Sequence, residues 1–225
     1  GGYRNIYVVG GKMGGNYHAP SDILVEGNKI TNKLGISTSP QHPGHYRNFL
    51  ITKMSLTDIH GVYLFNAGSN IEIKSNLIYG VGNGIQTWTS DLNYVSENLR
   101  IHHNYVVNAM DDALEPGVSC KGCRWYSNHI KNAAQGIIFK IKDNLSHGPV
   151  YVYRNVFYNQ NSKSVKENGR QFHNSQSSIF HHTGTVIPIY IYNNLLLDTR
   201  CYMQPTGGNI SQSGENLYFI NNIFS

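Results

Sequence analysis

The stretch from Asn98 to Lys140 reads NLRIHHNYVVNAMDDALEPGVSCKGCRWYSNHIKNAAQGIIFK and contains one pattern twice. In each copy, a short strand of alternating apolar residues is followed by asparagines and then by a second short strand. The repeated positions are Leu99, Ile101 and Asn104, then Cys123, Trp125 and Asn128. Two strands and an asparagine-marked turn, repeated in about two dozen residues, indicate one coil, or circuit of the chain, of a parallel β-solenoid.

The same pattern recurs from one end of the chain to the other. The apolar pairs that we expect to point inward are Ile6/Val8, Ile23/Val25, Phe49/Ile51, Ile71/Ile73, Leu99/Ile101, Cys123/Trp125, Val150/Val152, Ile189/Ile191 and Leu217/Phe219. The asparagines that follow them, with Met54 taking this place in one coil, are Asn28, Asn76, Asn104, Asn128, Asn155, Asn194 and Asn222. We expect these asparagines to tolerate a left-handed backbone at a turn and to stack as a ladder of side-chain amides. The pattern therefore predicts one all-β domain over residues 1–225 with about nine coils.

Composition agrees with a β fold and excludes several classes of protein. Only 14% of the residues are charged, and the 23 glycines and 16 tyrosines are more typical of strands and turns than of helices. The net charge of +5 permits an anionic partner, although no run of lysines and arginines marks a nucleic-acid-binding arm. No apolar stretch approaches the roughly 18 residues that a membrane span needs.

Two features interrupt the regular pattern. The segment from about residue 159 to 176 is predicted to be a long loop thrown out of one coil. Neither end of the sequence has a convincing cap, and an uncapped solenoid end exposes strand edges and apolar core. We therefore expect either that the 225 residues are part of a longer chain or that neighbouring copies cover the ends through homo-oligomeric, end-to-end contacts.

The cysteines and histidines do not predict a metal site. Cys120 and Cys123 form a single CxxC, and the third cysteine is Cys201, so the second CxxC of a zinc site is missing. A structural disulfide or free thiols are the better interpretations. His102-His103 and His181-His182 are adjacent pairs whose members would point to opposite faces of a strand.

Stacking the coils on this pattern places several polar and aromatic side chains on one outer face. The predicted first column contains Tyr63, Gln86 and Glu115, followed by Ile138 and Phe180. The second column, two residues further along each strand, contains Phe65, Trp88, Gly117, Lys140 and His182. Because adjacent coils lie about 4.8 Å apart, these side chains could act together in a groove.

Asp111, Asp112 and Glu115 form the densest acidic group in the chain. Aromatic rings stack on sugar rings, and a pair of carboxyl groups can protonate the leaving oxygen and activate water or attack. Crowding of the three carboxyls would raise the pKa of at least one, which keeps it protonated as an acid. The alternative is that Asp111 or Asp112 only caps the turn. On a second outer face, Arg124 and Arg100 could bind a carboxylate or sulfate or pair with Glu72, beside tyrosines that more often stabilise a ladder than bind a ligand.

The coil pattern, the asparagine ladder and the phrase GPVYVYRNVFYN (Gly148 to Asn159) resemble the right-handed parallel β-helix superfamily. That superfamily includes pectate lyases, polygalacturonase-type hydrolases, alginate lyases and epimerases, and phage tailspikes. The resemblance covers the whole chain and implies a right-handed solenoid. Asp111-Asp112 is similar in place to the Asp-Asp of the polygalacturonase-type hydrolases, whereas their other motifs read Gly82-Asn83-Gly84 and Ala134-Gln135-Gly136 here.

Three functions remain open on this basis. The favoured interpretation is a secreted or cell-surface enzyme that cleaves a polysaccharide by hydrolysis, with Asp111, Asp112, Glu115 and Lys140 as catalytic residues. Its predicted substrate-binding residues are Gln86, Trp88, Tyr63, Phe65, Arg124 and His182. A lyase acting on an acidic glycan would instead use Lys140 or Arg124 as base, with calcium held by the three carboxylates. The third interpretation is a non-catalytic spike, filament or surface protein.

Overall fold

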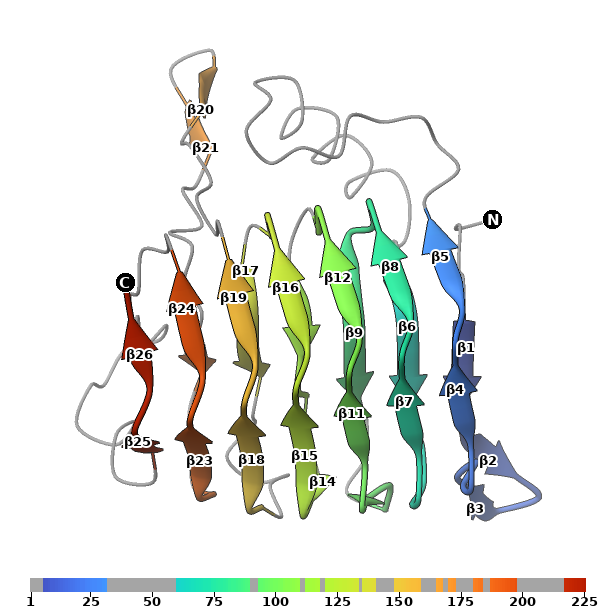
Figure 1. Ribbon diagram of the computed structural model, residues 1–225. Coiled ribbons are helices and arrows are strands. Elements are labelled where there is room, and N and C mark those ends of the chain that lie inside the picture. The colour runs from blue at the N-terminus through green and yellow to red at the C-terminus, as the bar shows by residue number, and fades with distance from the viewer. Residues whose placement is uncertain are drawn as a thin grey trace.

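The computed structural model describes residues 6–31, 60–89, 93–109, 112–117, 120–133, 135–140, 148–158, 165–167, 170–172, 180–183, 187–197 and 217–225. Within these ranges the chain is all β, with no helix. Figure 1 shows the strands side by side in long rows that run from one end of the molecule to the other.

Three parallel sheets contain most of the described strands, and we call them sheets A, B and C. Sheet A consists, in spatial order, of β1 (Ile6–Val9), β6 (His60–Phe65), β9 (Asn83–Trp88), β13 (Asp112–Glu115), β17 (Gln135–Lys140) and β22 (Phe180–Thr183). Sheet B consists of β4 (Leu24–Glu26), β7 (Glu72–Lys74), β11 (Arg100–His102), β15 (Cys123–Tyr126), β18 (Val150–Tyr153), β23 (Ile189–Tyr192) and β25 (Leu217–Ile220). Sheet C consists of β5 (Lys29–Thr31), β8 (Leu77–Tyr79), β12 (Tyr105–Val107), β16 (His129–Lys131), β19 (Val156–Tyr158), β24 (Leu195–Leu197) and β26 (Ile223–Phe224).

The chain visits the three sheets in rotation. After β6 in sheet A it forms β7 in sheet B and β8 in sheet C, and it then returns to sheet A as β9 beside β6. All neighbouring pairs within the three sheets are parallel, for example β11 with β7 and with β15. This arrangement agrees with the predicted all-β class and is compatible with a β-solenoid.

Three small two-stranded sheets lie outside these rows. β2 (Gly11–Met13) and β3 (Asn16–His18) form an exposed antiparallel hairpin, and β10 (Ser96–Glu97) pairs in parallel with β14 (Cys120–Lys121). The predicted loop at 159–176 contains the antiparallel hairpin of β20 (Val165–Glu167) and β21 (Arg170–Phe172), which stands away from the three sheets in Figure 1. The rest of that segment is outside the described residues.

The predicted asparagine ladder is present at the corner between sheets B and C. Asn128 shows the repeated geometry: its Oδ1 accepts hydrogen bonds from the backbone N–H of Asn104 at 3.1 Å and from Asn104 Nδ2 at 3.0 Å. Its own Nδ2 donates to the backbone oxygen of Ile101 at 2.9 Å and to Asn155 Oδ1 at 3.0 Å. Equivalent bonds link all the predicted members, which are Asn28, Asn76, Asn104, Asn128, Asn155, Asn194 and Asn222. The interior members are 0–1% exposed, so the ladder satisfies amides that have no access to water.

One coil of the prediction does not take its expected place. Asn28 Nδ2 donates directly to Asn76 Oδ1 at 3.0 Å, and β4 pairs directly with β7. The expectation that Met54 fills a rung between these asparagines is therefore wrong, because an intervening coil would separate them. Phe49 and Ile51 lie outside the described residues, and the count of nine coils stays a prediction.

Left-handed backbone at the corners belongs to different residues from those predicted. The ladder asparagines are not among the residues with positive φ, but the residue before each of them is, for example Ser127 with φ 52° and Arg154 with φ 55°. The residue before each ladder asparagine makes the turn, and the asparagine side chain forms the ladder. The corner between sheets C and A turns at Gly80, Asn108 and Asn132, all with positive φ. Glycine and asparagine reach this region at the lowest cost, which explains their abundance in the sequence.

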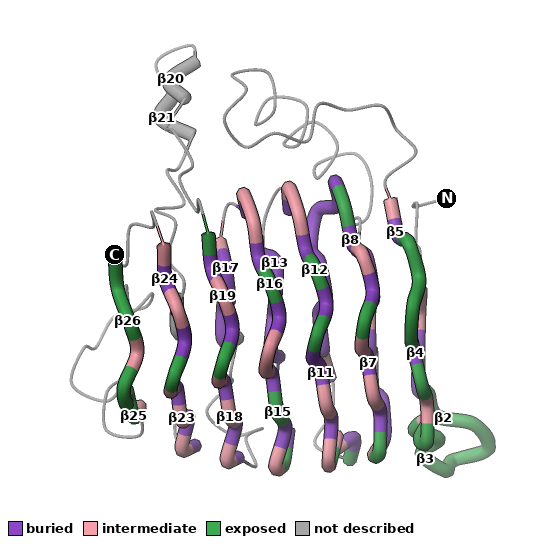
Figure 2. Tube along the Cα trace, viewed as in Figure 1, coloured by how far each residue is buried: buried purple, intermediate pink, exposed green. Residues whose placement is uncertain are grey.

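The core consists of like side chains stacked from strand to strand. In sheet B, one inward column runs through Val25, Ile73, Ile101, Trp125, Val152 and Ile191. These residues are 0–6% exposed, and Figure 2 shows buried positions recurring at the same level of successive strands. The column continues to Phe219, which is 38% exposed in β25. Burial of a large apolar side chain contributes about 1.5–3 kcal/mol, so these columns supply much of the stability.

The small residues in sheet A are required by close approach of neighbouring strands. A Cβ atom on Gly84 would collide with the backbone oxygen of Ala113 and lie 2.8 Å from Val106 Cγ1. A Cβ atom on Gly61 would lie 2.6 Å from Ile78 Cγ2. Crowding between strands therefore explains the glycine near the start of each of these two strands.

Replacing Asn128 with alanine should lower the free energy of unfolding by about 3 kcal/mol, because buried donors on Asn104 and the Ile101 carbonyl lose their partner. Chemical denaturation measures the change. Asn28→Ala is the matched control, since exposed Asn28 donates to the ladder without accepting from another member, and its loss should stay below about 1 kcal/mol. Equal losses in the two variants would contradict a stabilising role for the buried rungs.

Candidate functional site

The outer face of sheet A brings together most of the side chains predicted to form a site. The strand register sets Tyr63 of β6 beside Gln86 of β9, and Gln86 beside Glu115 of β13. It also sets Phe65 beside Trp88. These two rows agree with the columns expected from the sequence, because β6, β9 and β13 keep the same two-residue alternation of inward and outward side chains.

The two described carboxylates of this face are buried. Asp112 and Glu115 lie on β13 and are 1% and 0% exposed. Asn83 Nδ2 donates a 2.5 Å hydrogen bond to Glu115 Oε2 and therefore orients this carboxyl group. A ligand could reach Glu115 only after a change in its surroundings. Asp111 lies outside the described residues.

An aromatic cluster lies on β1 and β6, which β9 separates from the strand of the carboxylates, β13. The rings of His60 and Tyr63 stack at a centroid distance of 4.5 Å, and Tyr7 lies 4.9 Å from Tyr63. Phe65 extends the cluster, with its centroid 6.0 Å from that of Tyr63. Tyr63 and Phe65 are half-buried and Trp88 is too, so this part of the face is more open than the carboxylates.

Sequence analysis missed two residues of this face, His60 and Asn83. The sequence singled out Asn83 only within the motif Gly82-Asn83-Gly84, although it lies in β9 directly beside His60. Asp112 is likewise paired with Gln135 of β17. The sequence signal for these residues is a polar side chain directly before a glycine or alanine near the start of a sheet A strand. The residues at this position form a column, which is His60, Asn83, Asp112 and Gln135.

Lys140 and His182 lie on strands of sheet A, but their side chains are not described. Lys140 is the last residue of β17 and is paired with Thr183. His182 is paired with Phe139, whereas the predicted column placed His182 beside Lys140. The expected register of β22 is wrong by one residue, and a shift of one residue in a strand exchanges its two faces.

Arg124 is on a different sheet from the other predicted site residues. It is exposed on β15 in sheet B and paired with Arg100 on one side and Tyr151 on the other. The structure therefore does not join Arg124 to Gln86, Trp88 and Glu115 in one site.

The outer face of sheet B has two parts. Near β7, several side chains surround Glu72: its carboxylate lies 2.8 Å from His102 Nε2, 3.4 Å from Arg100 and 3.9 Å from Lys74. Further along, Tyr126, Tyr153 and Tyr192 stack with centroids 4.9 Å apart. Of the alternatives expected for the arginines, the pairing of Arg100 with Glu72 is present, and Arg124 lies beside Arg100 on the same face.

The His102-His103 pair was expected to divide between two faces of a strand, and this expectation is wrong; the side chains of His181 and His182 are not described. His103 turns the corner after β11 with φ 53°, and its Nδ1 lies 2.7 Å from Nδ1 of His102. In this contact one Nδ1 donates a hydrogen bond to the other, and the tautomers of the two rings decide which one donates. Over the part of the chain that the structure describes, no group of three or more His, Cys, Asp or Glu side chains is arranged to hold a metal ion.

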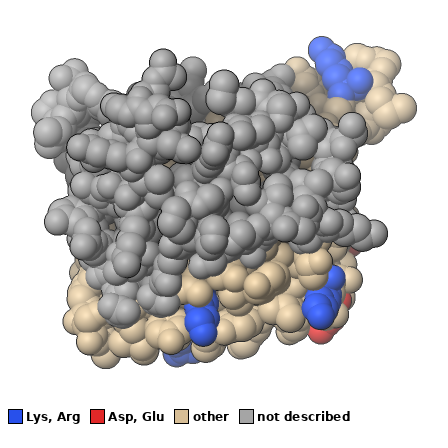
Figure 3. Space-filling view, turned by 90° about the horizontal axis from the view of Figure 1, so that it is seen from above, with Lys and Arg blue, Asp and Glu red and all other residues tan. Residues whose placement is uncertain are grey.

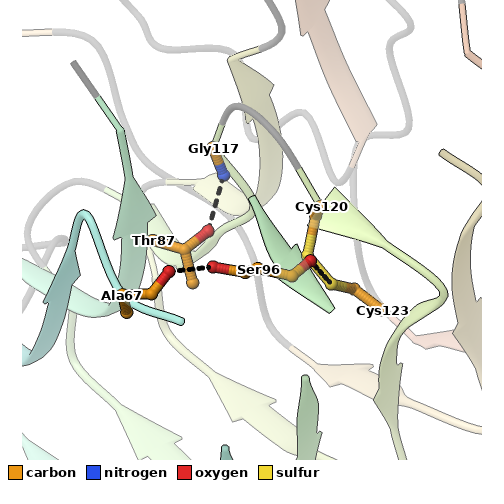
Figure 4. The surroundings of a disulfide bond; sticks show 6 residues. All are labelled: Ala67, Thr87, Ser96, Gly117, Cys120 and Cys123. Carbon is orange, nitrogen blue, oxygen red and sulfur yellow. Dashed lines mark hydrogen bonds between the residues drawn. A yellow bond between two sulfur atoms is a disulfide. The ribbon is translucent and has the colours of Figure 1, made fainter. Parts of the chain in front are cut away.

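Cys120 and Cys123 form a disulfide at the start of sheet B's strand β15, which resolves the alternatives left by the sequence (Figure 4). Both cysteines are buried, with exposures of 4% and 0%. In the same region Gly117 donates its N–H to Thr87 Oγ1 at 2.9 Å, and Ser96 Oγ donates to the Ala67 carbonyl at 3.0 Å. These contacts tie Gly117, after β13, and Ser96, after β9, each to the preceding coil.

Comparisons with known proteins add no identification. No protein-family model matches the chain, and no match was found among curated proteins or solved structures. Among the described residues, no helix is long and apolar enough to cross a membrane. In Figure 3, the described surface seen from above carries only scattered charged side chains. Function must therefore be argued from the sheet faces themselves.

Stability should fall as the pH is lowered, because of His102 and Glu72. Burial lowers the pKa of His102 below its ordinary value of 6.5, so the unfolded chain binds a proton more readily as the pH falls through that value. The hydrogen bond from His102 lowers the pKa of Glu72 below 4.5, and the stability it contributes is lost as the pH falls below that value. The melting temperature between pH 7.5 and 5.5 measures the first effect.

His102→Tyr tests this assignment, since a tyrosine would extend the stack above Tyr126, whose ring lies 4.5 Å from that of His102. The variant should lose part of the decrease in melting temperature between pH 7.5 and 5.5. His129→Gln, at an exposed position on sheet C, is the control and should retain the full decrease. An unchanged pH dependence in His102→Tyr would assign the effect to other groups.

Proposed function

We propose that this chain is a right-handed parallel β-helix that hydrolyses a polysaccharide on the outer face of sheet A. The observation that carries the proposal is the convergence of carboxyl groups and aromatic rings on that one face. Asp112 and Glu115 lie on β13, and Tyr63, Phe65 and Trp88 lie on the two strands before it. Aromatic rings for sugar faces, beside two carboxyl groups for proton transfer, are the parts that glycoside hydrolysis needs.

The proposed β-helix is supported by the passage of the chain through sheets A, B and C in rotation. The hydrogen-bonded ladder from Asn28 to Asn222 supports it further, because one amide per circuit indicates a regular rise from coil to coil. Right-handedness is the general preference of crossovers between parallel strands. About nine coils remain our prediction for the complete domain.

The carboxyl groups divide the chemistry. Glu115 accepts a hydrogen bond from Asn83, which is the role of a carboxylate, so we assign to it the activation of water or attack on the sugar. Asp112 then protonates the leaving oxygen. Gln86, in register with Glu115, is suited to hold a sugar hydroxyl. Because both acids are buried, substrate entry must be coupled to an opening of the face.

Hydrolysis is preferred to elimination because of what this face contains. Elimination needs a base and a cation that neutralises the carboxylate of a uronate sugar. Arg124, one of the bases considered from the sequence, is on sheet B. Calcium, the cofactor of the lyase alternative, was predicted to be held by Asp111 together with Asp112 and Glu115, and Asp111 lies outside the described residues.

A non-catalytic spike, filament or surface protein is the second candidate. Its supporting observation is the burial of Asp112 and Glu115 at 1% and 0% exposure. Under this alternative the two acids only stabilise the sheet. Both functions agree with a secreted or cell-surface location, which we propose because the Cys120–Cys123 disulfide persists in oxidising compartments.

Glu115→Gln and Asp112→Asn should each lower polysaccharide hydrolysis by at least about 100-fold, since general acid–base catalysis contributes roughly that much. The assay uses a panel of neutral and acidic polysaccharides, with and without calcium, and follows new reducing ends together with the ultraviolet absorbance of unsaturated products. Reducing ends without absorbance indicate hydrolysis.

Trp88→Ala should raise the KM by about tenfold through loss of stacking on the sugar.

Glu97→Gln is the matched control for the acid substitutions. Glu97 is exposed and pairs with Lys121 at 3.2 Å on the small β10–β14 sheet, so its loss should leave hydrolysis unchanged. Absorbance that depends on calcium would replace hydrolysis by elimination. Absence of cleavage across the panel by the folded wild-type chain would favour the non-catalytic alternative.

A further inference from the structure

The outer face of sheet B from β15 to β25 has a composition that the proposed hydrolysis does not use. Its outward positions and the corner beside it carry two arginines and six tyrosines, which are Arg124, Arg154, Tyr126, Tyr151, Tyr153, Tyr190, Tyr192 and Tyr218. We call this set the Arg–Tyr face. No carboxylate occupies an outward position of these four strands, so the Arg–Tyr face is positively charged and rich in hydroxyl groups.

The tyrosine rings of the Arg–Tyr face cover one another. Tyr153 lies between Tyr126 and Tyr192, with centroid distances of 4.9 Å on both sides and interplanar angles of 2° and 4°. Tyr190 lies in the same way between Tyr151 and Tyr218, at 5.4 and 4.8 Å. The ring faces are thus turned along the stack and their edges are turned outward. This leaves phenol hydroxyls for hydrogen bonds but no free face at Tyr153 or Tyr190 for stacking of a base or sugar.

The arginines are arranged in a way that internal charge balance does not explain. Arg100 and Arg124 are directly opposite each other in neighbouring parallel strands, and like charges in this position repel. Arg100 is compensated by Glu72 at 3.4 Å, but that carboxylate also serves His102 and Lys74. Within the described parts of the chain, neither Arg124 nor Arg154 forms an ion pair. Their positive charges are therefore available to an anion from outside.

The two arginines act on the same part of the face. Burial raises the pKa of Tyr153, whereas the charges of Arg124 and Arg154 both act in the opposite direction on this phenol. Burial likewise raises the pKa of Tyr192, and the same two charges act against this increase. Arg124 is exposed on β15 and Arg154 is exposed at the corner after β18. Two cations and the phenol hydroxyls of Tyr153 and Tyr192 are thus within electrostatic range of one another.

We propose that the Arg–Tyr face binds an anionic polysaccharide through the carboxylate or sulfate groups of its sugars. Arginine donates hydrogen bonds to such oxyanions in a planar, charge-assisted geometry, and the row of phenols supplies further donors at the spacing of the coils. The covered ring faces argue against single-stranded nucleic acid, whose bases need exposed aromatic faces. This binding is separate from the site on sheet A and does not depend on hydrolysis there.

Binding to immobilised polysaccharides at low ionic strength tests the proposal, with Glu115→Gln as the background so that cleavage does not disturb the measurement. The probes are polygalacturonate, dextran sulfate, uncharged dextran and a single-stranded oligonucleotide. We expect binding to polygalacturonate or dextran sulfate that weakens with added salt, and none to dextran. The double substitution Arg124→Gln with Arg154→Gln should weaken the binding by at least about tenfold, because two charge-assisted contacts are lost.

Two further variants separate this site from general attraction to a basic protein. Tyr153→Phe keeps the stack and removes one hydroxyl, and it should weaken binding by about threefold. Lys131→Gln is the control for loss of positive charge on another sheet, since Lys131 lies on sheet C above the ring of Tyr158 at 5.0 Å, and it should bind as the unmodified background does. Competition by free sulfate tests whether the site recognises a single anion or a polymer. If sulfate displaces the bound polysaccharide only at concentrations far above those at which dextran sulfate does, the site binds a polymer.

Unchanged binding by the double variant at equal melting temperature would overturn the proposal. So would equal weakening by Lys131→Gln, equal binding of uncharged dextran, or tighter binding of the oligonucleotide than of either anionic glycan. Failure of hydrolysis on sheet A would leave these results unaffected, because the assay measures binding and requires no cleavage by Asp112 or Glu115.

Discussion

The buried asparagine ladder is the interaction on which the rest of this structure depends. Each interior rung accepts from the coil before it and donates both to that coil and to the one after it, as Asn128 does with Asn104, Ile101 and Asn155. A buried amide without partners costs about 1–3 kcal/mol, so a coil that moved out of register would lose several such bonds together. The ladder therefore holds all three sheets to one common register.

This register turns a linear sequence into columns of like side chains. Inside, Ile73, Ile101 and Trp125 stack in a dry column. Outside, Tyr126, Tyr153 and Tyr192 stack in the same way on sheet B. Residues that are far apart in sequence but equivalent in the repeat become neighbours at one coil spacing. A few substitutions at equivalent positions can therefore create a functional surface without changing the fold.

The two outer faces considered above differ in charge and in the availability of aromatic rings. Sheet A combines the carboxylates Asp112 and Glu115 with half-buried rings, which suits chemistry on a sugar. The Arg–Tyr face of sheet B combines arginines that form no ion pair with any described residue and rings whose faces are covered. If both proposals hold, cleavage and retention of a glycan are divided between two sides of the molecule. The burial of Glu115 implies that access, rather than the presence of the acid, is the constraint on any chemistry at sheet A.

Sequence alone determined the all-β class, the asparagines of the ladder and the alternation of inward and outward residues, because these follow from local periodicity. The tertiary structure decided which coils are neighbours. Asn28 bonds directly to Asn76, 48 residues further along the chain, and the coil predicted between them does not intervene. The long connection is tolerated because the entropic cost of closing a loop rises only slowly with its length. It also decided the register of His182, the contact of His102 with His103, the placement of Arg124 on sheet B and the burial of Glu115. Each of these depends on packing between distant segments, which no local pattern encodes.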